Sequence, residues 1–177
     1  MKADEYVQKA YFSILSNDFE EAIRWFERAI AAEPDNADYR YRCSITYARS
    51  GRLDQALEHA KLAVTLAPGQ DEYKIHLNSL EAKRLAGEVR KMLSGGGSPD
   101  DPARARAINM LYEAVKLDPL CADAYVLLAL AHNELNQFDE ALAAVGEAID
   151  LLPQEGQLIE LQLELLERKK NYRDSQK

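Results

Sequence analysis

The sequence contains few of the residues that carry chemistry, with two cysteines, three histidines and eight glycines among 177 residues. Cys43 and Cys121 have neither the spacing of a metal site nor the number expected of a disulfide framework, and Cys43 reads as a small core residue. The histidines are scattered, and we interpret His132 as a packing residue. We therefore expect no enzymatic activity, no catalytic residues, no cofactor and no metal.

Long apolar runs and targeting signals are also missing. The first twelve residues lack the apolar core of a secretory signal, and the longest apolar run, 124–131, is too short to cross a bilayer. No Asn-x-Ser/Thr glycosylation acceptor occurs. Together with the sparse cysteines, these absences predict a cytoplasmic protein that does not insert into a membrane.

Positive charge is scarce. The sequence has 30 acidic and 22 basic side chains and a formal net charge of −8. Nucleic acids and anionic membranes both require a basic surface, so we expect no nucleic-acid partner. Residues 168–177 are locally basic, and we interpret them as a solvated chain end.

The chain does have a regular spacing of prolines. Pro34 and Pro68 are 34 residues apart, as are Pro119 and Pro153, while the gap between Pro68 and Pro119 is one such period plus 17 residues. Two alanines, seven residues apart, precede each proline. Alanines at this spacing share one helix face and let a neighbouring helix approach closely. The alanine pairs are Ala22 and Ala29, Ala56 and Ala63, Ala107 and Ala114, and Ala141 and Ala148.

Each period is predicted to form a pair of helices. Asn17, Gly51 and Asn136 recur in the same phase, and both residue types tolerate the left-handed turn that separates two helices. Each proline follows the end of the second helix because it cannot continue one. The four predicted helix pairs span about 3–36, 37–70, 71–121 and 122–155.

A further helix, about 156–173, is predicted to cover the apolar face of the last pair, because a repeat cannot bury that face alone. Leu158, Leu161 and Leu165 are spaced to pack on that pair. Glu160 and Glu164 are expected to face water, so that the outer side of this closing helix is polar.

This spacing resembles the tetratricopeptide repeat (TPR), in which an Ala-x3-Phe element precedes a proline in a 34-residue period. Ala22, Phe26 and Pro34 match closely, while the first half of each repeat is degenerate. The resemblance covers about residues 3–155. It implies an all-α, right-handed α-α superhelix of about four TPR-like helix pairs plus the closing helix, in a single domain over 1–177. It also implies a non-enzymatic adaptor that binds a protein or peptide.

The third helix pair departs from the pattern through its 17-residue insertion. The helical apolar stripe continues past Leu85, the segment 95–98 is predicted to end that helix, and Asp101 and Pro102 are expected to cap and begin the next one. One interpretation is a tolerated loop. The other is a second candidate contact surface on this extended hairpin, formed by Leu85, Val89, Met92 and Leu93.

The resemblance further implies that the first helix of each pair lines a concave side that holds a peptide. Tyrosines, aliphatic residues and a few cations there would suit a segment with apolar anchors and an acidic residue, although some of these side chains could instead pack between helices. The residues whose helical phase points to that side are Val7, Tyr11, Tyr41, Ile45, Arg49, Ile75, Lys83, Val126 and Leu130.

Chaperone adaptors of this family clamp a carboxylate with lysines, asparagines and an arginine. Among the matching positions here only Arg42 could serve, since the others hold Val7, Tyr11, Glu72 and His76. We therefore expect no binding of chaperone tails. Two alternatives to an adaptor stay open: a client-shielding chaperone, and a structural protein that self-assembles as a homo-oligomer through the extended third hairpin or the ends of the superhelix.

Overall fold

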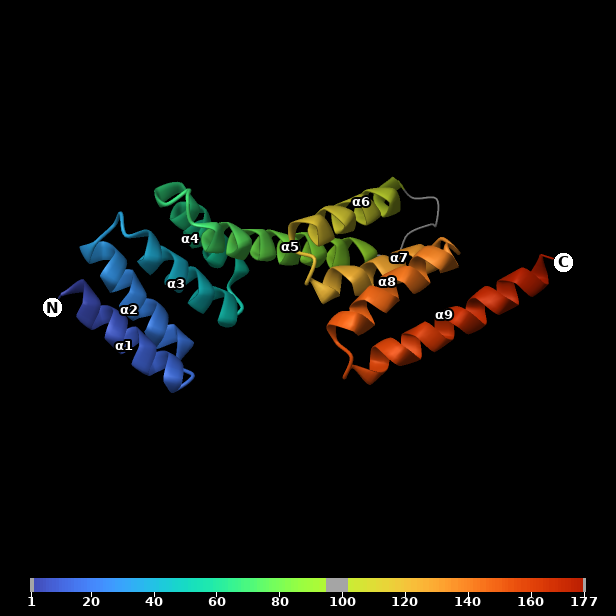
Figure 1. The fold of residues 1–177 in the computed structure, drawn as a ribbon, viewed down its shortest axis with the longest axis horizontal. Helices are drawn as coiled ribbons and strands as arrows, with labels where there is room; N and C mark the ends of the chain where they lie inside the picture. The colour runs from blue at the N-terminus through green and yellow to red at the C-terminus, as the bar shows by residue number, and fades with distance from the viewer. Residues whose placement is uncertain (1, 95–101, 177) are drawn as a thin grey trace. The chain divides into compact units, whose positions relative to one another are not determined.

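The structure is a computed structural model that describes residues 2–94 and 102–176. Within those residues all regular secondary structure is α-helical, which confirms the predicted all-α fold class (Figure 1). The helices are α1 (Ala3–Leu15), α2 (Phe19–Ala32), α3 (Ala37–Arg49), α4 (Leu53–Leu66), α5 (Asp71–Ser94), α6 (Pro102–Leu117), α7 (Ala122–Glu134), α8 (Phe138–Leu151) and α9 (Gly156–Ser175).

The predicted turn residues adopt left-handed backbone conformations. The φ angles are +57° at Asn17, +80° at Gly51 and +56° at Asn136. The third helix pair has Leu85 at the corresponding position, and a leucine resists that conformation. The helix therefore does not turn there, and α5 continues for 24 residues.

The paired alanines lie on the buried face of the second helix of each pair. All eight are fully buried, as the spacing predicts. The residue four positions after the first alanine lies on the same helix face and is buried as well. Phe26 in α2 and Val145 in α8 are examples. Pro102 begins α6 as expected, whereas Asp101 and the predicted helix end at 95–98 lie outside the described residues.

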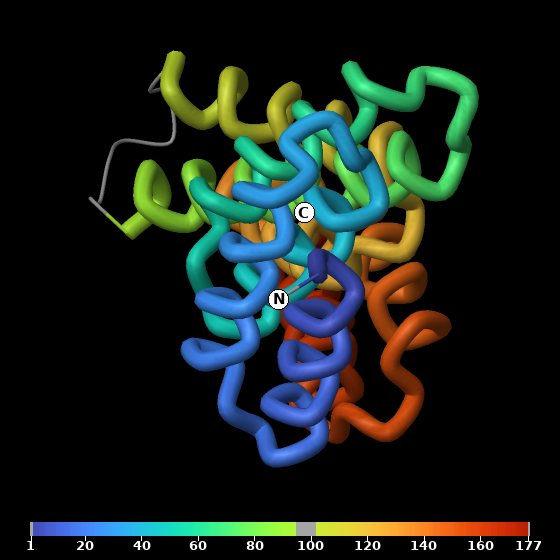
Figure 2. The backbone as a smooth tube through the Cα atoms, turned by 90° about the vertical axis from the view of Figure 1, so that its left-hand side faces the viewer, coloured from blue at the N-terminus to red at the C-terminus, as the bar shows by residue number. Residues whose placement is uncertain are grey.

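The chain divides into two compact units, Met1–Leu80 (unit 1) and Glu81–Lys177 (unit 2). Each unit has its own apolar core, and Figure 2 shows the backbone of both. Phe26 and Leu80 are buried in unit 1, and Leu111 and Leu165 in unit 2. The expectation of a single domain over the whole chain stays a prediction.

Trp25, the single tryptophan of the sequence, lies on α2 in unit 1. Its ring stacks on Tyr6 of α1 with 6.0 Å between ring centroids. The Nζ of Lys9 and the guanidinium of Arg28 lie 4.4 and 4.5 Å from the Trp25 ring centroid. Such contacts between a cation and an aromatic face each contribute about 0.5–1 kcal/mol at exposed sites.

In unit 2 the closing helix α9 packs as predicted through Leu158, Leu161 and Leu165. An ion pair between Lys169 and Asp139 links α9 to the start of α8 and lowers the pKa of the Asp139 carboxyl.

His132 on α7 is buried and bridges two other segments. Its Nδ1 lies 2.7 Å from Oε1 of Gln137, and its Nε2 lies 3.0 Å from the hydroxyl of Tyr112. Because an amide oxygen can only accept, Nδ1 donates and Nε2 accepts from the tyrosine. The predicted packing role of His132 is confirmed, with two hydrogen bonds in addition.

Candidate functional site

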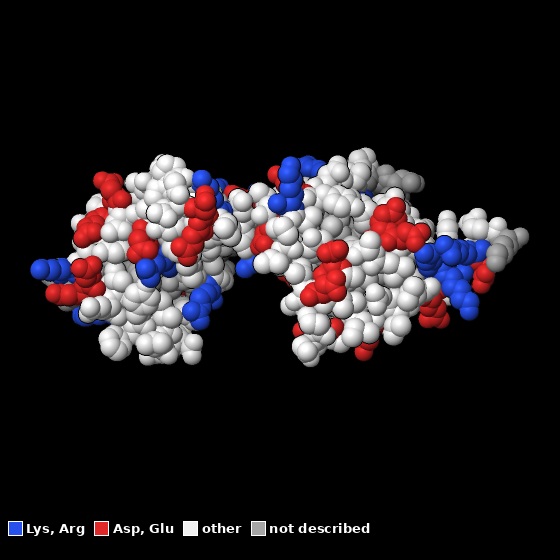
Figure 3. Space-filling view, in the orientation of Figure 1, with Lys and Arg blue, Asp and Glu red and all other residues white. Residues whose placement is uncertain are grey.

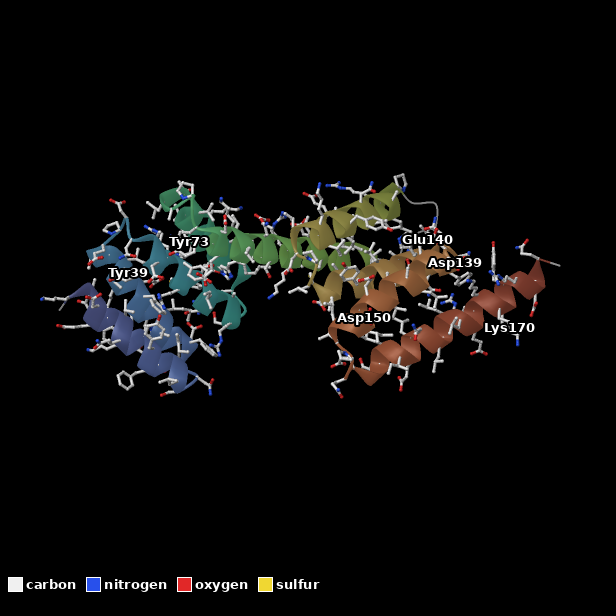
Figure 4. The ribbon with its side chains drawn as sticks, in the orientation of Figure 1. Tyr39, Tyr73, Asp139, Glu140, Asp150 and Lys170 are labelled. Atoms are coloured by element: carbon white, nitrogen blue, oxygen red, sulfur yellow. The ribbon has the colours of Figure 1, made fainter. Side chains whose placement is uncertain are left out.

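Six of the nine predicted binding residues lie in unit 1, on helices that are adjacent in space. The hydroxyl of Tyr39 on α3 donates to Asp4 on α1 (3.1 Å), and the hydroxyl of Tyr41 donates to Glu72 on α5 (2.9 Å). Figure 4 labels Tyr39 and Tyr73 on these helices. We call this surface of unit 1 the first-helix face; its predicted binding residues are Val7, Tyr11, Tyr41, Ile45, Arg49 and Ile75.

The residues of the first-helix face differ in exposure. Ile75 is 68% exposed, and Tyr11 and Arg49 are also exposed. Tyr41 and Ile45 are half-buried, and Val7 is half-buried against the core of unit 1. An exposed isoleucine on the helix that also carries Tyr73 is a side chain that a partner could cover.

Tyr41 is held at the centre of this face by its neighbours. Its ring centroid lies 4.6 Å from that of Tyr73 and 5.4 Å from that of His76, which meets it edge-on. Burial, together with the hydrogen bond to Glu72, raises the pKa of Tyr41 to about 12. The hydroxyl therefore stays protonated at neutral pH and can donate to Glu72. Sequence reasoning missed Tyr73, although it stands 34 residues after Tyr39 and the period could have revealed it.

The two ends of the first-helix face differ in charge. Near the start of α3, Asp38 accepts a hydrogen bond from Arg42 (2.5 Å), and burial together with the nearby Glu72 raises the pKa of Asp38. Arg42, the one possible clamp residue, is thus already engaged, and its guanidinium also lies 5.5 Å from the Tyr11 ring. At the other end of α3, Arg49 lies over the ring of Phe19.

The remaining three predicted residues lie in unit 2. Lys83 is on α5, and Val126 and Leu130 are on α7. Lys83 and Leu130 are exposed, and Val126 is half-buried. An ion pair between Arg90 and Asp123 (3.3 Å) shows that α5 and α7 are adjacent, so the first helices of this unit also share a surface.

The candidate contact on the extended hairpin requires a correction. Val89 is fully buried, Leu85 is 7% exposed, and both belong to the core of unit 2. Leu93 is half-buried against the same core, and only Met92 is exposed. The prediction that this stripe contacts a partner is therefore wrong for Leu85 and Val89, because unit 2 itself covers them.

The thiols are poorly placed for chemistry. Cys43 is fully buried, and burial raises its pKa to about 12; burial also raises the pKa of Cys121. Across 2–94 and 102–176, no group of three or more His, Cys, Asp or Glu side chains could hold a metal ion. Within that same part of the chain, every helix is too short or too polar to cross a lipid bilayer.

Charge is unevenly distributed on unit 2. Basic side chains gather on the C-terminal half of α9 (Figure 3), where Arg168, Lys169, Lys170 and Arg173 follow one another. Leu166 and Tyr172 lie beside them. This is the basic chain end noted in the sequence, and in the structure it forms part of a regular helix.

Comparison with known families agrees with this geometry. Models of the tetratricopeptide repeat match residues 13–83 and 104–156. The chain belongs to the tetratricopeptide repeat family. TPR proteins are generally non-enzymatic modules for protein–protein interaction, so the chain has a fold that supports a protein-interaction or scaffold role. No curated protein matches the sequence.

Solved TPR structures share the fold. A crystal structure of MamA protein is 24% identical with a TM-score of 0.54, over 98% of this chain and 85% of that one. MamA 41-end from Desulfovibrio magneticus RS-1 is 20% identical with a TM-score of 0.56, over 97% of this chain and 88% of that one. At these identities the likeness shows a common TPR fold.

Proposed function

We propose that the first-helix face of unit 1 binds an extended segment of a partner protein. Ile75 carries the proposal, because it is a large apolar side chain that is 68% exposed on α5, the helix whose Tyr73 ring contacts Tyr41. An apolar anchor of the partner that covers Ile75 would remove apolar area from water. Each Å² removed contributes about 25 cal/mol of favourable free energy. Tyr11 and Ile45 extend the same surface along α1 and α3.

The partner segment should carry an acidic residue at one end. Arg49 lies one helical turn after Ile45, and its guanidinium is exposed while it rests on Phe19. The acids at the opposite end are engaged within the protein, since Glu72 accepts from Tyr41 and Asp38 accepts from Arg42. These acids also lie in the first turns of their helices, where they complement the helix dipole.

Lys83, Val126 and Leu130 form a second candidate surface of the same kind within unit 2. The net charge of −8 disfavours nucleic acid as the partner of either surface. The two free, buried cysteines fit a reducing cytoplasm. We infer a non-enzymatic adaptor in that compartment.

The proposal can be tested with peptides selected from a random display library against the full chain. The selected peptides are then titrated against the parent, Ile75→Asp, Arg49→Glu and the control Leu66→Asp. Leu66 is an exposed leucine on α4, outside the first-helix face. We expect Ile75→Asp to weaken binding about tenfold or more, which corresponds to about 1.4 kcal/mol.

The effect of Arg49→Glu should depend on the peptide. Acidic peptides should lose affinity, and their uncharged analogues should not. Peptides that bind the parent and Ile75→Asp equally well, while both melt alike, would place the binding surface elsewhere. Equal losses for Leu66→Asp would show a general effect of added charge.

A further inference from the structure

Helix α1 leaves uncovered a position that the other repeats bury. Phe12 is 72% exposed, although the same position of the following first helices and of α9 lies between packed helices. A large aromatic at this exposed position is unlike a solvated surface residue. The residues at the corresponding positions are Thr46, Leu80, Ala131 and Leu165, exposed by 1%, 1%, 2% and 0%.

Leu15, one turn after Phe12, also differs from the residues at the corresponding positions of the other repeats. It is 80% exposed, and the residues at the corresponding positions are Arg49, Lys83 and Glu134, all charged. The other repeats thus place a solvated side chain where α1 has a leucine. Phe12 and Leu15 make one apolar stripe on the side of α1 that its own repeat does not cover.

Helix α9 has an uncovered apolar stripe of its own, which corrects the expectation of a polar outer side. Ile159, Leu163 and Leu166 are 46%, 61% and 49% exposed. Their spacing of four and three residues is that of a coiled-coil seam, which fits another helix. Among the described residues no helix covers this stripe.

The two stripes match when the helices run antiparallel. Glu5 lies seven residues before Phe12, and Lys170 lies seven residues after Leu163. Seven residues make about two helical turns, so pairing Glu5 with Lys170 sets Phe12 opposite Leu163. Leu15 then falls opposite Glu160, next to Ile159. Opposite charges meet at one end, and Phe12 and Leu15 meet the apolar side chains Leu163 and Ile159 towards the other.

We propose that α9 of one copy of this chain packs antiparallel on α1 of a second copy. The contact is heterologous, so each copy keeps one free stripe and further copies add as concentration rises. It lies outside the first-helix face, since Phe12 and Leu15 are not among the residues of that face.

Pairing of α9 with α9 of a second copy is disfavoured by charge. Glu160 and Glu167 lie on the same edge of the stripe and are exposed. An antiparallel pair related by a twofold axis brings that edge of both helices together, and like charges there repel. The α1 helix instead presents Gln8 opposite Glu167.

The test uses the full chain and two variants, Phe12→Glu and Leu163→Glu, each on one side of the contact. Mass is measured by sedimentation and light scattering over a range of about 1 µM to 1 mM, where weak protein contacts dissociate. The parent should increase in mass with concentration, and each variant alone should stay monomeric. An equimolar mixture of the two variants should form a dimer and nothing larger, because only one pair of intact stripes remains.

Other outcomes overturn the proposal. A parent that is monomeric throughout contradicts it, as does a single variant that still associates or a mixture that stays monomeric. Leu120→Glu is the matched control, since Leu120 is 75% exposed and lies in the loop before α7. The Leu120→Glu variant should associate as the parent does. If this variant is monomeric, added charge alone prevents assembly. Circular dichroism melts confirm that all variants are folded.

Discussion

The hydroxyl of Ser44 on α3 lies 2.9 Å from Nε2 of His76 on α5. The same hydroxyl donates its proton to the backbone carbonyl of Ala56 on α4, at 2.7 Å. A serine hydroxyl has one proton, so Nε2 of His76 must be the donor in the other hydrogen bond. Ser44 is fully buried and thereby links three helices of unit 1.

Ser44→Ala should lower the free energy of unfolding by about 1–3 kcal/mol, because the Ala56 carbonyl and the His76 ring each lose a hydrogen bond. Urea unfolding measures this change. Thr65→Ala is the control, since Thr65 is exposed on α4 and bonds only to its own helix; it should stay within about 0.5 kcal/mol of the parent. Equal stability of the two variants would mean that the link through Ser44 contributes nothing.

The alanine stripe can be tested within one helix. Ala141 and Ala143 both lie on α8, but Ala141 is fully buried and Ala143 is exposed. Ala141→Leu should cost about 1–3 kcal/mol because it overpacks a close helix contact. Ala143→Leu should have little effect on the thermal melt, and a similar loss for both would contradict the assignment of Ala141 to the helix contact.

The extended part of α5 offers a second matched pair. Leu85→Ala should destabilise unit 2 by about 2–5 kcal/mol, because it opens a cavity in the core. Met92→Ala should cost much less, since Met92 is 36% exposed. Chemical denaturation followed by circular dichroism measures both. A small effect of Leu85→Ala, similar to that of Met92→Ala, would restore the idea that this stripe is a surface.

Stability should depend on pH through His59 on α4. Its ring stacks on Tyr47, with 5.3 Å between centroids, and its Nδ1 has no hydrogen-bond partner among the described residues. Burial lowers the pKa of His59, and the nearby Arg40 lowers it further. The unfolded chain therefore takes up this proton at a higher pH than the folded chain does. The free energy of unfolding should fall as pH drops below about 6.5, the ordinary histidine pKa.

His59→Gln should remove this part of the pH dependence. Thermal melts of parent and variant at several pH values between about 5 and 8 make the comparison, and the difference between the two proteins isolates the contribution of His59. If the parent loses no more stability on acidification than the variant, the folded protein does not hold His59 neutral.

Much of the fold follows from local rules that a single sequence displays. Proline ends helices, Asn17 and Asn136 permit left-handed turns, and alanines seven apart mark close helix contacts. The long α5 was also predictable, because Leu85 cannot replace an asparagine in a left-handed turn. These rules act within a few residues of one another, so the period of the sequence is enough to apply them.

The side of each helix that stays uncovered could not be read in the same way. Val89 and Leu163 both lie on apolar helical stripes, yet unit 2 covers Val89 and leaves Leu163 exposed. Periodicity identifies a stripe but does not say which neighbour packs on it. Tyr41 shows the same limit, since its contacts with Tyr73 and Glu72 depend on the placement of a different helix.

The single tryptophan makes the two compact units separable in one experiment. Trp25 is in unit 1, against Tyr6 and near two cations, so its fluorescence should report the unfolding of that unit alone. Far-ultraviolet circular dichroism reports the helices of both units. If the two signals change at different denaturant concentrations, the units unfold in separate steps, and the order of the steps shows which unit is the weaker.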